Sequence, residues 1–68
     1  MPCYIVNKRA QTNGDHEVHK EGCQHMPDLD NQMPLGAHES CRTAVEKAKG
    51  RYPSADGCKF CCPECNHG

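Results

Sequence analysis

The sequence predicts a small α+β domain with an N-terminal β-hairpin, one main helix and a C-terminal cysteine knuckle. Three observations support this prediction. Residues 3–8 hold a run of β-branched and aromatic residues, which is typical of a strand. Residues 41–48 repeat apolar residues at helical spacing, and a Cys-x2-Cys pair at 58–61 follows a turn-rich segment. A chain of 68 residues has room for one domain, so we expect residues 1–68 to fold as a single unit.

The first two strands are expected to form the hairpin. Residues 3–8 make the first strand, and residues 16–20 alternate in the way expected of the returning strand. Asn13-Gly14 lies between them and is a strong turn signal. The segment 21–38 is rich in Pro, Gly and Asp, so we expect mostly loop there, with a short third strand at its end, over 33–38.

A helix is expected over residues 40–50. Ser40 stands at the N-cap position, and Gly50 stands where a helix-terminating glycine is common. Good helix formers fill the interior. The apolar residues fall at i, i+3, i+4 and i+7, which makes one stripe facing a core: Cys41, Ala44, Val45 and Ala48.

The composition leaves little material for that core. Leu, Ile, Val and Phe together number seven of the 68 residues, and seven more residues are cysteine. A core of this size contributes no more than ~3–5 kcal/mol, so domains of this kind are held by a metal or by disulfides. The cysteines are the residues that can provide such links.

Two features favour metal ligands over disulfides. Seven cysteines cannot all pair within one chain. Residues 1–10 contain no apolar run long enough for a secretory signal, and no segment approaches the length of a transmembrane helix. We therefore expect a cytoplasmic protein without a membrane partner, in a reducing compartment where thiols stay available for a metal.

The C-terminal cysteines cannot all act as one helical face. Cys58, Cys61, Cys62 and Cys65 have helical spacing, but Pro63 would break a helix through them. We expect Cys58 and Cys61 to form a knuckle whose thiolates point at one metal ion. Cys62 would then cap a short helix that begins at Pro63.

A structural zinc site needs four ligands, and the knuckle supplies two. The sequence offers a second pair, His19-x3-Cys23, at the end of the second hairpin strand. Joining His19 and Cys23 to Cys58 and Cys61 makes a Cys3His zinc site. Such a site would tie the hairpin to the C-terminal segment, where the small core stabilises least.

Several alternatives stay open. Cys65 and Cys62 are alternate ligands from the knuckle segment, although adjacent cysteines diverge in direction, and His67 competes for a place. His19 is equally open to being an exposed strand histidine. Cys41 is expected to pack as a small hydrophobe. The remaining histidines are expected to face solvent: His16, His25 and His38.

These ligand pairs and the helix resemble the small zinc domain of Ada-type methyl-phosphotriester repair proteins. The similarity covers VHKEGC (18–23), LGAHESCRTAVEKAKG (35–50) and GCKFC (57–61), with Ser40 and Ala44 at the family's helix positions. The tail also resembles that of small Cys-rich bacterial proteins ending in Gly-Cys-x2-Cys-x3-Cys-His, although here Asn66 precedes His67. The resemblance implies zinc. It does not extend to methyl transfer, because His19 stands where the family has its methyl-accepting cysteine.

The charge balance argues against a nucleic-acid partner. Eight Lys and Arg against nine Asp and Glu give a net charge of −1, so nucleic acid is possible but not supported by charge. The chain also lacks a Gly-rich phosphate loop, a nucleophile elbow and a His-Glu-x-x-His motif, so we do not expect an enzyme. The leading hypothesis is a structural zinc-binding module that contacts an unknown macromolecular partner. The alternative is a thiol redox or metal-handling protein that uses the cluster at 58–65.

Overall fold

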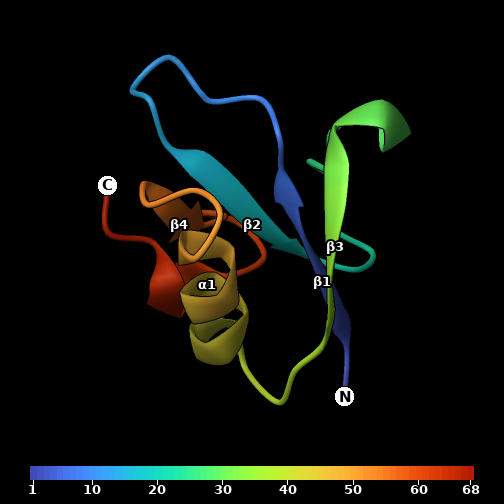
Figure 1. Ribbon diagram of the computed structural model, residues 1–68. Helices are drawn as coiled ribbons and strands as arrows, with labels where there is room; N and C mark the ends of the chain where they lie inside the picture. The colour runs from blue at the N-terminus through green and yellow to red at the C-terminus, as the bar shows by residue number, and fades with distance from the viewer.

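The computed structural model describes all residues 1–68 as a four-stranded mixed sheet with one helix packed against one face (Figure 1). The strands lie in the order β3-β1-β2-β4, and their bounds are Cys3–Asn7 for β1, His16–Lys20 for β2, Gln32–Ala37 for β3 and Ala55–Gly57 for β4. β1 pairs antiparallel with both β2 and β3, whereas β4 pairs parallel with β2. The helix α1 spans Cys41–Lys49, and two short 3-10 turns, η1 and η2, span Leu29–Asn31 and Pro63–Cys65.

The predicted α+β class, the hairpin, the third strand and the helix are confirmed. β4 was not predicted, because the segment 51–57 carries turn residues and Ala-Asp-Gly has low strand propensity. Its strand conformation comes from pairing with β2, which lies almost forty residues earlier, and such long-range pairing leaves no local signal. None of the helices has the length and the apolar content needed to cross a membrane.

The helix α1 begins and ends where the sequence predicts, but the expected capping hydrogen bond and glycine conformation are not present. Ser40 is the N-cap residue, but its hydroxyl makes no capping hydrogen bond. Gly50 ends the helix at φ −64°, a right-handed conformation open to any residue, so the conformational freedom of glycine is not used there.

The core lies between α1 and the sheet. Val6 and Val18 are cross-strand partners with no exposed surface, and Leu35 is 1% exposed. The predicted helix stripe is confirmed, because all four of its residues are buried: Cys41, Ala44, Val45 and Ala48. Small alanine side chains let the helix backbone approach the sheet closely, which is how so few large apolar residues can still close a core.

A disulfide joins Cys41 at the start of α1 to Cys65 in η2, with the two Cα atoms 6.4 Å apart. The preference for metal ligands over disulfides is therefore wrong for this pair. Cys41 does pack in the helix stripe as expected, and it is also covalently bonded. An odd number of cysteines means that they cannot all form disulfides within one chain, but two of the seven can still form one. The other five cysteines are free.

The C-terminal segment is held against β4 by a buried carboxylate. Asp56 is 8% exposed and accepts backbone N–H groups from His67 at 3.0 Å and from Gly68 at 3.3 Å. The side-chain amide of Asn66 donates to the same carboxylate and to the carbonyl of Gly57. Hydrogen bonds accepted by a carboxylate are stronger than those between neutral groups. This network fixes the segment that carries the cysteine knuckle.

Candidate metal centre

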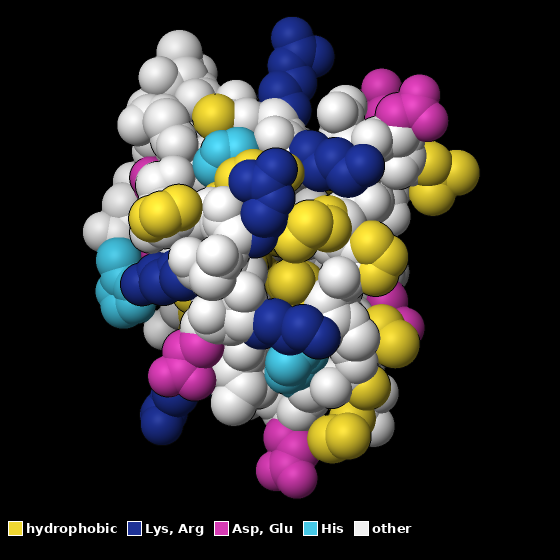
Figure 2. Space-filling view, in the orientation of Figure 1, with side chains coloured by type: hydrophobic (Ala, Val, Ile, Leu, Met, Phe, Trp, Pro, Cys, Tyr) yellow, Lys and Arg dark blue, Asp and Glu magenta, His cyan; other side chains and the backbone are white.

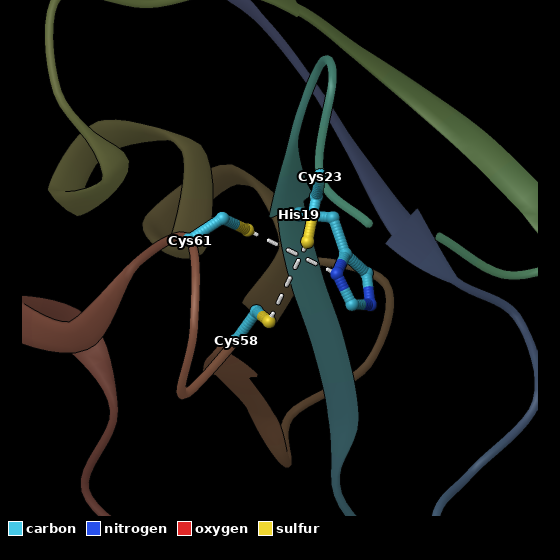
Figure 3. A group of neighbouring side chains, drawn as sticks. All are labelled: His19, Cys23, Cys58 and Cys61. Carbon is cyan, nitrogen blue, oxygen red and sulfur yellow. Dashed lines mark hydrogen bonds between the residues drawn. The ribbon is translucent and has the colours of Figure 1, made fainter. Parts of the chain in front are cut away.

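Four side chains from separate parts of the chain converge on one point (Figure 3). His19 lies on β2, Cys23 lies in the loop that follows it, and Cys58 and Cys61 form the turn after β4. Their ligand atoms all lie within 4.8 Å of one another. The four residues predicted as ligands are thus brought together, and the group can hold a metal ion.

The distances within the group suit a tetrahedral ion. Sγ of Cys23 lies 3.9 Å from Sγ of Cys58, and Nδ1 of His19 lies 3.9 Å from Sγ of Cys61. Zinc bonds of ~2.3 Å to sulfur and ~2.0 Å to nitrogen separate tetrahedral ligand atoms by about 3.5–3.8 Å. These two distances are within a few tenths of an ångström of the tetrahedral values, and the remaining distances are no longer than 4.8 Å. Three sulfur atoms and an imidazole favour zinc over calcium or magnesium, which prefer oxygen ligands.

The sheet register brings the two ligand pairs together. Gly57 pairs with Val18, and the N–H of Cys58 donates to the carbonyl of Val18 at 2.9 Å. Continuing this register by one residue places Cys58 beside His19. Both residues then belong to the sheet face opposite the one that holds Val18. The knuckle then closes through a hydrogen bond from the N–H of Cys62 to the carbonyl of Cys58, at 2.9 Å.

Each sulfur atom of the group accepts one backbone N–H. The donors are Phe60 for Cys58 and His25 for Cys23, both at 3.4 Å, and Lys20 for Cys61 at 3.3 Å. A hydrogen bond to a thiolate favours its charged form, which is the form that binds metal. Burial acts in the opposite direction and raises the pKa of Cys61. A bound cation would offset that burial effect.

His19 is buried rather than exposed, with 1% of its surface accessible, so the alternative of an exposed strand histidine is wrong. Its Nδ1 faces the sulfur atoms, and its Nε2 makes no hydrogen bond. Oε1 of Glu17 lies 3.4 Å from that Nε2. Burial lowers the pKa of His19, and the Glu17 carboxylate opposes this shift. The neutral imidazole that results is the form that binds metal.

We expect Glu17→Gln to weaken zinc binding about 10–100-fold, because ligating histidines depend on a carboxylate at their second nitrogen. The Glu17 carboxylate lies 3.4 Å from Nε2 of His19 without a hydrogen bond in this structure, and we expect it to accept one from the Nε2–H group when Nδ1 binds the metal. Competition with a chromophoric chelator measures the affinity. Glu46→Gln removes the same charge from an exposed position on α1 and should leave the affinity unchanged. Equal affinities for the two variants would exclude this role of Glu17.

The other expected ligands lie outside the group. Cys65 is bonded to Cys41, and His67 is exposed near the C-terminal end. Cys62 has no exposed surface and belongs to the core, although its Sγ lies 3.8 Å from Sγ of Cys61. Burial raises the pKa of the Cys62 thiol. Adjacent cysteines therefore do diverge, with Cys61 in the ligand group and Cys62 in the core.

The remaining histidines occupy three different environments. His25 is exposed, as expected, and stacks on the ring of Phe60 at 4.1 Å between centroids. His16 was also expected to face solvent, but it is half-buried. Its ring stacks on that of Tyr52, with the two ring centroids 4.0 Å apart. His38 is also half-buried, and its Nε2 lies 2.8 Å from the carbonyl of Leu35.

Sequence reasoning missed Glu17 because a carboxylate two residues before a histidine on one strand is common. The alternation of a strand does put residues 17 and 19 on one face, and that is the signal that could have identified it. No family model, curated protein or solved structure matches the chain. The resemblance to the Ada-type zinc domain stays a prediction.

Proposed function

We propose that this protein is a structural zinc-binding module that serves as an interaction domain for a macromolecular partner. The observation that carries the proposal is the convergence of His19, Cys23, Cys58 and Cys61, with ligand atoms within 4.8 Å of one another. Four protein ligands complete a tetrahedral zinc ion and leave no position for a reactive water. For that reason we propose a structural role and no enzymatic activity.

The position of the group supports a structural role. Cys23 and Cys58 are 35 positions apart, and β3 and α1 lie between them in the chain. A metal ion there closes a loop that contains β3 and α1, and it fastens the turn after the edge strand β4 to β2. It acts at the sheet face where His19, rather than a large apolar side chain, occupies the buried position. The ion would thus replace the core that this face lacks.

A protein partner fits the surface better than a nucleic acid does. On the face seen in Figure 2, Lys and Arg side chains are interspersed with uncharged and hydrophobic atoms, and acidic side chains lie at the margins. The net charge of −1 provides no general attraction for phosphate. Phe60 is 64% exposed beside the metal group, where it stacks on His25. Aromatic residues in such positions are common contacts in protein interfaces.

We also propose a cytoplasmic location, on the ground that five of the seven cysteines are free. In that compartment thiol reductants would act on the Cys41–Cys65 bond, because cytosolic disulfides are rare.

Native mass spectrometry combined with rapid alkylation of the same folded sample tests the proposal. Outside the ligand group and the disulfide, the chain has only Cys3, which is exposed, and Cys62, which is buried. We expect one zinc ion per disulfide-bonded chain and one rapidly alkylated thiol, with the ligand thiols becoming reactive after a chelator is added. A zinc-supplemented sample that carries no metal would exclude the proposal.

A metal-handling or thiol redox role is the second candidate, and one observation favours it. Cys23 and Cys61 are half-buried and border an open pocket of about 230 Å³, together with Gln24, His25 and Phe60. A second thiol could reach the metal ligands through that pocket. Zinc transfer to a chelator within seconds, and fast alkylation of Cys23 in the loaded protein, would favour this role. Transfer over hours would favour the structural one.

A further inference from the structure

A second group of metal-ligating side chains lies at the disulfide. The ligand atoms of Cys41, Glu64 and Cys65 all lie within 4.8 Å of one another. Cys41 is the first residue of α1, whereas Glu64 and Cys65 belong to η2. Oε1 of Glu64 lies 3.3 Å from Sγ of Cys41. This group shares no residue with the candidate metal centre described above.

An open pocket of about 300 Å³ borders this group. Its lining consists of Ser40, Cys41, Arg42, Glu64, Cys65 and His67. A water molecule occupies about 30 Å³ in the liquid, so the pocket has room for an ion together with water. His67 brings an imidazole to the same pocket, where it can serve as a further ligand.

We propose that Cys41, Glu64 and Cys65 form a second zinc site when the disulfide between the two cysteines is reduced. A dithiol reductant transfers two electrons and two protons to the disulfide, which becomes two thiols, while the reductant becomes a disulfide. Zinc then displaces the two thiol protons and binds both sulfur atoms and the Glu64 carboxylate. In the oxidised protein the two sulfur atoms are bonded to each other, so neither is a thiolate and the site is closed.

The positions of the side chains suit this change. The two Cα atoms are 6.4 Å apart, and rotation about the Cα–Cβ bonds of the two reduced cysteines can separate the sulfur atoms to the ~3.8 Å of a tetrahedral zinc site. Cys41 and Cys65 are buried while Glu64 is exposed. The two sulfur atoms would therefore bind the ion from the protein interior, and the carboxylate would bind it from the solvent-facing side. The start of α1 also favours negative charge on Cys41. Two thiolates with one carboxylate suit zinc better than calcium or magnesium.

The redox state of this pair would therefore set the zinc content of the protein. The full-length chain, loaded with zinc, is measured by native mass spectrometry before and after treatment with a water-soluble phosphine. The phosphine reduces the disulfide with consumption of one water and becomes a phosphine oxide. We expect one zinc ion per oxidised chain and two per reduced chain, with the mass rise of two hydrogens reporting the reduction.

Two variants locate the second ion. Cys41→Ser should leave a single zinc ion under both conditions. Glu64→Gln keeps the disulfide and alters an exposed residue, so it should fold normally and bind the second ion about tenfold more weakly or worse. Cys3→Ser removes an exposed thiol outside both groups and should still gain the second ion on reduction.

The outcomes separate this proposal from the proposed function. One zinc ion in both redox states would overturn the second site and leave the first intact. A second ion that persists in Cys41→Ser would also overturn it, because the ion would then lie elsewhere. An oxidised chain without zinc would instead overturn the proposed function. In that case, a single ion gained on reduction and lost in Cys41→Ser would still support the second site.

Discussion

Removing zinc from the loaded protein with a chelator will abolish the cooperative thermal unfolding transition, because the domain will already be unfolded. Metal binding contributes ~10–16 kcal/mol in comparable small sites. A core that buries only four Leu and Val residues contributes far less, no more than ~3–5 kcal/mol. Circular dichroism of the loaded and chelated protein, followed during heating, measures the effect.

Restoring the transition by adding excess zinc is the control for this experiment. A matched pair of variants tests the same expectation without a chelator. Cys58 is 1% exposed in the ligand group, and Cys58→Ser should unfold the domain. Cys3 is exposed and free, and Cys3→Ser should leave the melting temperature within about 4 °C, since surface substitutions stay within ~0.5 kcal/mol. A chelated protein that melts as the loaded one does would contradict a structural role for the metal.

Gly57→Ala is expected to destabilise the domain by about 3 kcal/mol or more, because the added Cβ would overpack a closed site. A Cβ atom at residue 57 would lie 2.7 Å from Cβ of Cys65 and 2.8 Å from the carbonyl oxygen of Cys62. The carbonyl belongs to the backbone and Cys65 is held by a disulfide, so neither can move cheaply. Zinc-dependent stability in urea measures the loss.

Gly50→Ala is the matched control. Gly50 ends α1 in a right-handed conformation, and an added Cβ would meet only the carbonyl oxygen of Lys47, at 3.3 Å. We expect a change of less than about 1 kcal/mol, since alanine has the higher helix propensity. Similar losses for Gly50→Ala and Gly57→Ala would mean that close packing against β4 is not what requires glycine.

The candidate site was predicted from two local patterns, His19-x3-Cys23 and Cys58-x2-Cys61. Short spacings of this kind are visible in a sequence because both members of a pair must approach one ion from one turn. The partners of the ligands were not visible. Glu17 is identified only when strand alternation and the burial of His19 are both known.

The disulfide, unlike the ligand pairs, could not be predicted from a local pattern. Cys41 and Cys65 are separated by 24 positions, and no local pattern connects them. They meet because α1 packs on the sheet and η2 turns back over the start of α1. Among the C-terminal cysteines, spacing alone therefore could not separate Cys61, which joins the ligand group, from Cys65, which joins the disulfide.

The sequence by itself determined the hairpin, the helix with its buried stripe, and the two pairs of candidate ligands, because each depends on residues close together in the chain. Only the tertiary structure decided the position of β4, the partner of Cys41 and the burial of Cys62 in the core. These features depend on contacts between distant segments. In a domain with so small a core, such contacts are set by sheet register and by helix packing, which no short stretch of sequence encodes.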